Sequence, residues 1–283
     1  MAFGDLNRIN TNLQSLDARF SLDRINRDLA ETQLRLSTGF RINKAEDDAA
    51  GFSISAKLGA RIAGLEQALS NSGDTKSVLD IAEASFNSIV DILTTLKTNA
   101  TQAANDTLGS EERTFIQSQV DSLLTELDSI IEQTVFQGNN LLDGSFNFTF
   151  QVGERTADTI NIEIGFASGT SNLGFQATAL QLSGIAVGSQ TNAAAALASI
   201  DAAITTVASA VNSLGIYQTQ LSIREEILTQ SINSNNAARS RIRDADFARE
   251  QSESIKLQIL QQTAITALAQ ANVAPQAVLG FIS

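Results

Sequence analysis

The chain of 283 residues has no cysteine, no histidine and no tryptophan, and it has one proline and one tyrosine. Without cysteine there is no disulfide and no thiol nucleophile, and thiols cannot report the redox compartment. Without histidine the commonest general base is missing, and no Ser-His-Asp triad can form. Carboxylates, hydroxyls, amides, lysine and arginine remain for chemistry. We therefore expect no enzyme, no cofactor and no metal site.

Acidic residues outnumber basic ones by 31 to 19, which gives the chain a formal net charge of −12. This sign argues against a nucleic-acid partner, because the phosphate backbone is also negative. It suits a protein whose copies repel one another until a specific contact forms.

Long apolar runs are also missing. The first eight residues are polar and lack the apolar core, about 7–15 residues long, of a cleavable signal peptide. No apolar run approaches the roughly 18 residues of a membrane span. We expect no membrane span, and a protein that stays in the cytoplasm or leaves it without a cleaved signal.

Both ends of the chain carry apolar residues at helical spacing. The first stripe consists of Leu6, Ile9, Leu13, Leu16 and Phe20. A second stripe resumes with an offset at Leu22, Ile25, Leu29 and Leu36. A last helix, predicted over about 244–270, carries Leu257, Leu260, Ala264, Leu268 and Ala271. Two such ends can pack against each other or against other copies, and we predict that residues 6–36 lie beside 250–272.

Gly39 stands where the first helix needs a C-cap, and residues 39–51 are predicted to form a connector. Further helices are predicted over 52–104, from Ser110 onward, and over 191–238. The first of these has one heptad phase through Leu58, Leu65, Leu79, Phe86, Leu93 and Ala100, with Gly73-Asp74 as a candidate kink. The second has its stripe at Ile116, Val120, Leu123, Leu127 and Ile130. The third has its heptad interrupted by polar Gln218 and Glu225.

Between these helices the apolar period changes to two. Phenylalanines alternate with polar residues from Phe146 to Phe150, and isoleucines alternate from Ile160 to Ile164. Period two on both sides of a polar turn predicts a β-hairpin over about 146–164. Residues 165–190 are irregular, with room for another short strand pair.

Carboxylates occur in pairs beside distinctive sequence at Asp47-Asp48 and at Asp244 and Asp246. A general acid–base pair needs a raised pKa and a cleft, and neither is visible in the sequence. Asp47 and Asp48 are interpreted as starting or capping the next helix. Arg241, Arg243, Asp244 and Asp246 are interpreted as a surface charge cluster or hinge before the last helix.

Two stretches, one near each end, resemble bacterial flagellin. The N-terminal stretch is Arg35-Leu36-Ser37-Thr38-Gly39-Phe40-Arg41-Ile42-Asn43, followed by Asp47-Asp48-Ala49-Ala50-Gly51. The C-terminal stretch comprises Ser240-Arg241-Ile242, Asp244-Ala245-Asp246, Gln258-Ile259-Leu260-Gln261-Gln262 and Leu268-Ala269-Gln270-Ala271-Asn272. The resemblance covers roughly residues 1–140 and 190–283.

The resemblance implies a structural subunit that self-assembles into the helical filament of the flagellum for motility. Its expected partners are many copies of itself, the flagellar type III export apparatus, an export chaperone, and the hook-associated junction and cap proteins. Its expected location is outside the cell, after export in an unfolded state without a cleaved signal peptide.

The implied fold is mainly α, with long antiparallel, coiled-coil helices from both termini, a helical bundle and one β-hairpin. Residues 1–44 with 246–283 would form an inner-core domain, and residues 45–245 an outer-tube domain with the hairpin and the irregular segment. Large outer insert domains would be absent. The residues assigned to packing between subunits are Leu6, Ile9, Leu13, Leu16, Phe20, Leu29, Leu36, Leu257, Leu260, Ala264, Leu268 and Ala271. Those assigned to the joint between domains are Arg41, Asn43, Asp47, Asp48, Arg241, Asp244 and Asp246.

The sequence departs from the family at positions that contact an animal innate immune receptor, toll-like receptor five. Thr95, Asn99 and Gln119 stand where receptor-activating flagellins carry Arg, Leu and Glu. We therefore expect weak receptor binding.

Other classes of protein share some of these features. A hook–filament junction protein uses the same export route and terminal helices, and it is the alternative function. An enzyme carried on a coiled-coil scaffold lacks a catalytic constellation here, and a cytoplasmic coiled-coil adaptor would not explain both family stretches.

Overall fold

The computed structural model describes residues 11–168 and 171–279, with side chains described over 11–166 and 173–273. Leu6 and Ile9 of the first stripe lie outside the described residues. The chain divides into two compact units. We call Met1–Ala60 with Ser234–Ser283 the terminal unit, and Arg61–Asn233 the central unit.

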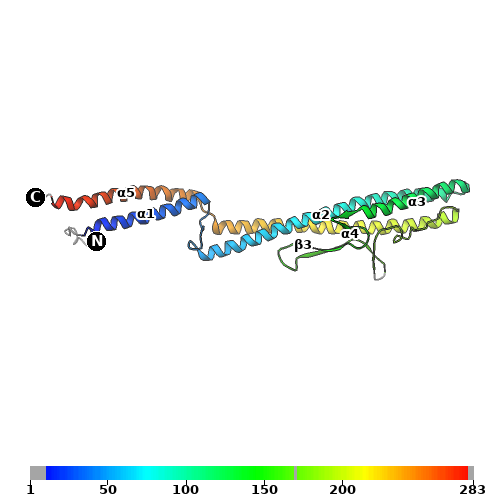
Figure 1. Cartoon of the computed structure of the whole chain (residues 1–283), viewed down its shortest axis with the longest axis horizontal. Coiled ribbons are helices and arrows are strands. Elements are labelled where there is room, and N and C mark those ends of the chain that lie inside the picture. Colours follow the sequence, from blue (N-terminus) through cyan, green and yellow to red (C-terminus); the bar gives the residue numbers. More distant parts are fainter. Residues whose placement is uncertain (1–10, 169–170, 280–283) are drawn as a thin grey trace. The chain divides into compact units, whose positions relative to one another are not determined.

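In the terminal unit, helix α1 (Leu13–Thr38) lies antiparallel to helix α5 (Phe247–Leu279), as Figure 1 shows. The side chain of Ser15 donates a hydrogen bond to Asn272 at 2.7 Å, and that of Gln261 donates to Asn26 at 2.7 Å. These bonds confirm the predicted pairing of the two ends of the chain.

The ends of these helices follow local rules. The Asn12 side chain caps α1 by accepting a bond from the Ser15 amide at 3.1 Å. Gly39 closes α1 with a φ of 72°, a left-handed conformation that favours glycine. The Asp246 carboxylate caps α5 by accepting from the amides of Ala248 and Arg249.

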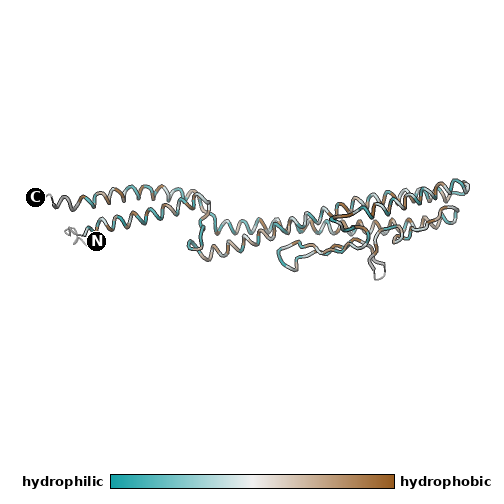
Figure 2. Tube along the Cα trace, in the orientation of Figure 1, coloured by the Kyte–Doolittle hydropathy of each residue, from teal (hydrophilic) through white to brown (hydrophobic). Residues whose placement is uncertain are grey.

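Three long helices make up most of the central unit: α2 (Ala49–Ala103), α3 (Ser110–Gln133) and α4 (Gln190–Arg243). Helix α2 continues through Gly73 without a break in its helical assignment. Along the traces in Figure 2, apolar and polar residues alternate, as amphipathic helices require. The heptad positions of α2 from Leu65 to Ala100 supply much of the core.

Helix α3 differs in detail from its predicted stripe. Its buried residues are Ile116, Val120, Leu124, Leu127 and Ile131. Leu123 and Ile130, which the 3.5-residue spacing selects, are only partly buried. An α-helix has 3.6 residues per turn, so the buried face drifts from a strict heptad.

The predicted hairpin is present as β3 (Asn147–Gln151) paired with β4 (Thr159–Glu163), with Phe148 opposite Ile162. Two further antiparallel pairs add to the single hairpin that the sequence predicts. They are β1 (Val135–Phe136) with β2 (Asn139–Asn140), and β5 (Phe166–Ser168) with β6 (Ser171–Leu173). Gln137 and Gly138 both have positive φ in the first turn, the geometry that joins strands through two residues.

The irregular segment after β6 belongs to the core. Phe175 is fully buried, and its ring meets that of Phe86 edge-on with centroids 4.8 Å apart. Two side chains of α3 hold this segment in place. Asp128 accepts a bond from the Ala177 amide at 2.7 Å, and Gln117 accepts one from the Val187 amide at 2.6 Å.

Among the described residues, α4 contains one 18-residue window with a mean hydropathy of 1.6, enough by length and composition for a membrane span. In the structure 22% of that window is buried, and Ile200, Ala203 and Val207 of this helix lie in the core of the central unit. One such helix is weak evidence for a span, because core helices of globular proteins have the same composition.

The hydrogen bonds of the Gln117 side chain predict an effect on stability. Changing Gln117 to alanine leaves the Val187 amide and the Ile185 carbonyl without their side-chain partner. We expect the free energy of unfolding in urea to fall by about 1–3 kcal/mol. Gln119→Ala is the matched control, because that side chain is exposed on the same helix. Equal effects of the two substitutions would contradict this role of Gln117.

Candidate assembly surface and helix connector

Helix α1 has two apolar faces. Leu13, Leu16 and Phe20 are 37%, 53% and 68% exposed. Leu29 is buried, and Leu22 and Ile25 are partly buried, on the side that meets α5. At 100° per residue the two sets point in nearly opposite directions. The offset in the sequence thus separates an outward stripe from a seam within the chain.

Helix α5 is divided in the same way. Leu257 is buried, and Ala264, Leu268 and Ala271 are partly buried on the side that bonds to α1. Leu260 is 41% exposed. Three isoleucines that the predicted stripe omits are also exposed: Ile255, Ile259 and Ile265.

These placements divide the residues assigned to packing between subunits into two groups. Six of them line the α1–α5 seam of one chain: Leu29, Leu36, Leu257, Ala264, Leu268 and Ala271. Leu13, Leu16, Phe20 and Leu260 remain available to another molecule. The reason is geometric, because periodicity identifies an apolar face without identifying the partner that covers it.

The connector between α1 and α2 is fastened to the end of α4. The Arg41 amide donates to the Arg243 carbonyl at 2.7 Å, and the Arg41 guanidinium donates to the Ile242 carbonyl at 2.7 Å. In return Arg243 Nε donates to the Ile42 carbonyl at 3.3 Å, and its guanidinium lies 4.2 Å from the centre of the Phe40 ring. The joint residues near both ends of the chain therefore meet within the terminal unit.

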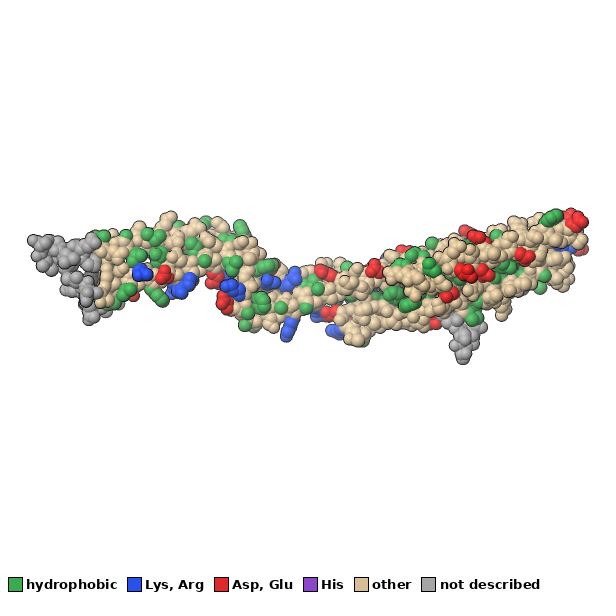
Figure 3. Space-filling model, viewed as in Figure 1, with side chains coloured by type: hydrophobic (Ala, Val, Ile, Leu, Met, Phe, Trp, Pro, Cys, Tyr) green, Lys and Arg blue, Asp and Glu red, His purple; other side chains and the backbone are tan. Residues whose placement is uncertain are grey.

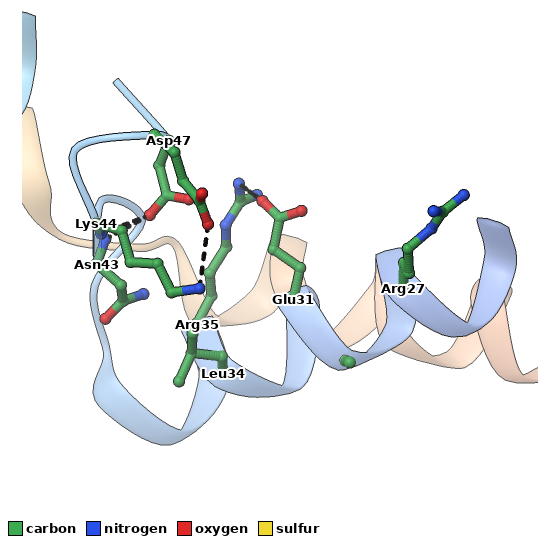
Figure 4. A pocket seen from close by; sticks show the side chains of 9 residues that line it. Arg27, Glu31, Leu34, Arg35, Asn43, Lys44 and Asp47 are labelled. Carbon is green, nitrogen blue, oxygen red and sulfur yellow. Dashed lines mark hydrogen bonds and ion pairs between the residues drawn. The ribbon is translucent and has the colours of Figure 1, made fainter. Parts of the chain in front are cut away.

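Asp47 stabilises the fold of the connector through hydrogen bonds to its backbone. Its carboxylate accepts bonds from the backbone amides of Asn43 and Lys44, both at 2.8 Å (Figure 4). The Lys44 and Asn43 amides stabilise the charged form and lower the pKa of the Asp47 carboxyl below its ordinary value of 3.8. A lowered pKa suits a structural anion and not a general acid.

Asp48 starts α2. Its carboxylate accepts a bond from the Gly51 amide at 2.9 Å. A Cβ added to Gly51 would lie 2.5 Å from Asp48 Oδ2 and 2.7 Å from Ile42 Cδ1, so any larger residue would displace these two side chains. The interpretation of the pair as helix-starting residues agrees with the contacts of Asp48, whereas Asp47 bonds to the connector before the helix.

The other joint residues have separate positions. Asp244 forms an antiparallel bridge with Phe40, Asp246 caps α5, and Arg241 is exposed. A cavity of about 750 Å³ beside the connector is lined by charges of both signs, among them Arg35, Lys44 and Asp47. Figure 4 shows Arg27 at its edge, pointing away from the other labelled side chains. No group of three or more acidic residues in the described ranges is placed to hold a metal ion.

The three receptor-related positions lie in the central unit in two environments. Thr95 and Gln119 are exposed, whereas Asn99 is buried. The Asn99 amide nitrogen has no hydrogen-bond partner in the structure.

Charge is divided unequally between the two units, which composition for the whole chain does not reveal. The terminal unit has 13 basic and 12 acidic residues, a net charge of +1. The central unit has 6 basic and 19 acidic residues, a net charge of −13. The face in Figure 3 shows many carboxylates and few basic side chains over the central unit. Like copies therefore repel through the central unit far more than through the terminal unit.

Two models of known protein families match the sequence of this chain. A family model described as "Bacterial flagellin N-terminal helical region" matches residues 9–147. A second, "Bacterial flagellin C-terminal helical region", matches residues 197–282. Together the two matches cover both halves of the α1–α5 pair.

Curated relatives align over nearly the whole chain. A flagellin of Listeria monocytogenes is 30% identical over 98% of this chain and 99% of its own length. A flagellar filament 33 kDa core protein of Treponema phagedenis is 31% identical over 97% of this chain and 99% of its own length.

A solved structure of a protein assigned as flagellar hook-associated, from Vibrio parahaemolyticus, has a TM-score of 0.58 and 16% identity. The match covers 70% of this chain and 100% of the Vibrio chain. At this identity the likeness concerns the fold alone.

The connector generates a pH prediction. The folded pKa of Asp47 is lowered, so its stabilising contribution is complete above the ordinary value of 3.8 and is lost as pH falls through the lowered pKa. We expect an NMR titration to place the Asp47 carboxyl pKa below 3.8, and the Asn43 and Lys44 amide signals to shift with it. Asp47→Asn should abolish this shift, whereas Glu46→Gln should leave it. An Asp47 pKa at or above 3.8 would refute the role of these bonds.

Proposed function

This chain belongs to the bacterial flagellin family, and from that premise we propose that it is the structural subunit of a helical flagellar filament, located outside the cell. The observation that carries the proposal is the outward apolar face of a helix pair built from both ends of the chain. Relatives aligned over almost their full length are named as flagellin and as filament core protein. No specific observation favours the junction-protein alternative.

The outward stripes supply the attraction between subunits. Burying an exposed leucine, isoleucine or phenylalanine is worth about 1.5–3 kcal/mol. Leu16 and Phe20 on α1, with Ile255 and Ile259 on α5, are about half exposed or more, so each helix offers apolar surface to a neighbour. Contacts between different faces of identical subunits generate rings when the rotation closes and helical filaments when it does not.

The charge distribution favours the same geometry. Neighbours that meet through nearly neutral terminal units avoid most of the repulsion between central units of net charge −13. We propose that residues 1–44 with 246–283 form the inner core of the filament and that residues 45–245 form its outer tube.

Export and the remaining partners complete the proposal. The protein leaves the cell unfolded through the flagellar type III apparatus, assisted by a chaperone and without a cleaved signal peptide, and it meets junction and cap proteins at the filament ends. The absence of cysteine and the single proline support this route, because neither disulfides nor several slow prolyl isomerisations delay refolding.

A seeded polymerisation assay tests the filament proposal. We expect Phe20→Ser to slow elongation of sonicated filament seeds by at least about tenfold, since a loss of roughly 1.5–3 kcal/mol of burial is at stake at each new contact. Circular dichroism of the dilute monomer should stay unchanged, because Phe20 faces away from the α1–α5 seam.

Phe115→Ser is the matched control, since it removes an exposed phenylalanine from the central unit. Elongation of the Phe20 variant at the rate of the unchanged protein would refute the outward stripe. Failure of the unchanged protein to extend any seeds would refute the filament subunit itself.

We also propose that this flagellin is a weak ligand of toll-like receptor five. A reporter-cell assay with purified monomer should show little activation. The triple variant Thr95→Arg, Asn99→Leu and Gln119→Glu restores the family residues and should raise activation, and Asn99→Leu also removes the unpartnered buried amide. Full activation by the unchanged monomer would disprove the proposal.

A further inference from the structure

Two heptad series of α2 face the core of the central unit. One series consists of Leu65, Ser72, Leu79, Phe86, Leu93 and Ala100, and the other of Ala68, Thr75, Ala82, Ile89, Leu96 and Ala103. All twelve side chains are buried, and only Ser72 and Thr75, both 0% exposed, are polar. A single hydroxyl layer therefore interrupts these two otherwise apolar series.

The hydroxyls of this layer bond to their own helix. Ser72 donates to the Ala68 carbonyl at 3.0 Å, and Thr75 donates to the Asn71 carbonyl at 2.6 Å. Back-bonding of this kind slightly destabilises a helix and often bends it. With their donors used on α2, these hydroxyls add little cohesion to the contact with α4.

The rim of the layer is polar on both helices. Lys76 Nζ donates to Ser222 Oγ at 3.1 Å and lies 3.7 Å from a Glu225 carboxylate oxygen. The Gln218 amide donates to Asp80 at 3.1 Å and to Glu83 at 2.7 Å. Gln218 and Glu225 thus interrupt the α4 heptad where α2 offers polar partners. Partly exposed pairs contribute little stability, but polar seam residues select one register.

The layer also divides the apolar core. Leu65, Ala68 and Leu228 form a small cluster with Leu69 and Ile232, separate from the main core that begins at Val78 and Leu221. Gly73 lies inside the layer, and a Cβ there would meet nothing within 4 Å. Packing therefore does not require this glycine, which lowers the helical stability of α2 at the same place.

We propose that the Ser72–Thr75 layer is a soft point of the α2–α4 seam. Residues 61–71 with 224–233, the Leu65 segment, open and repack there independently of the main core. The hairpin tip closes the segment through two contacts. Asn71 donates to the Gln151 carbonyl at 3.1 Å, and Arg61 pairs with Glu154 at 2.7 Å. The α2–α4 helix pair can then bend at the Ser72–Thr75 layer while the main core of the central unit stays intact.

Hydrogen–deuterium exchange of the dilute full-length protein tests the soft point. We expect amides of the Leu65 segment to exchange at least about tenfold faster than those of 86–100 in α2. The double variant Ser72→Ala and Thr75→Val removes both buried hydroxyls with little change of shape. It should slow exchange in the Leu65 segment by about tenfold, because it ends the back-bonding that destabilises α2 and buries a methyl group in place of the Thr75 hydroxyl.

The matched control is Ser88→Ala with Thr98→Val, which removes two hydroxyls with the same bonding pattern from the exposed side of α2. This control should leave the Leu65 segment unchanged. Gly73→Ala, which meets no neighbour, should slow exchange in the same segment and gives a second test if the double variant misfolds.

Two results would overturn the proposal. One is equal exchange in the Leu65 segment and in 86–100 of the unchanged protein. The other is a failure of both layer variants to slow exchange in the segment beyond the control. Since exchange is measured on the monomer, either result is independent of whether the protein forms filaments.

Discussion

Antiparallel pairing of helices from opposite ends of the chain is the interaction on which the terminal unit and its exposed apolar stripes depend. The Asn12 side chain donates to the Ala271 carbonyl although 259 residues of sequence separate them. Such closure is affordable because the entropy of closing a loop grows only logarithmically with its length. In the same unit the connector after α1 meets the end of α4. The Arg41 and Ile42 amides donate to the Arg243 carbonyl, and the Arg243 side chain donates to the Ile42 carbonyl.

Much of this arrangement is predictable from sequence because its rules are local. Gly39 and Asp48 mark helix boundaries through caps that involve only neighbouring residues. Asp246, interpreted from the sequence as part of a charge cluster or hinge, caps α5 in the same local way. The hairpin is predictable because apolar residues at every second position are typical of a half-buried strand and do not fit one face of a helix. Family resemblance adds the filament function, which no spacing of apolar residues could specify.

The remaining features depend on contacts between distant segments. The partner of each face of α1 is decided by α5, so Leu29 and Leu16 look alike in sequence and differ in burial. The segment around Phe175 has no periodicity, because the polar side chains of α3 hold it by its backbone. The burial of Asn99 also cannot be predicted from the sequence, because its position in the helical pattern is compatible with an exposed residue as well as with a buried one.

The two units bury apolar surface to very different extents, and this difference bears on assembly. Within the described residues of α1 and α5, the buried apolar side chains are Leu29 and Leu257, and Thr32 and Ser254 are buried beside them. The central unit instead has a continuous core from Val78 to Leu221. A pair of helices with so thin a seam is marginal by itself, because most helical stability comes from packing of the apolar face. Neighbours that cover Leu16, Phe20, Ile255 and Ile259 would add the missing packing, and their binding would stabilise the folded terminal unit by mass action. The exposed stripe and the thin seam therefore fit together, because assembly through the stripe would supply the packing that a single terminal unit lacks.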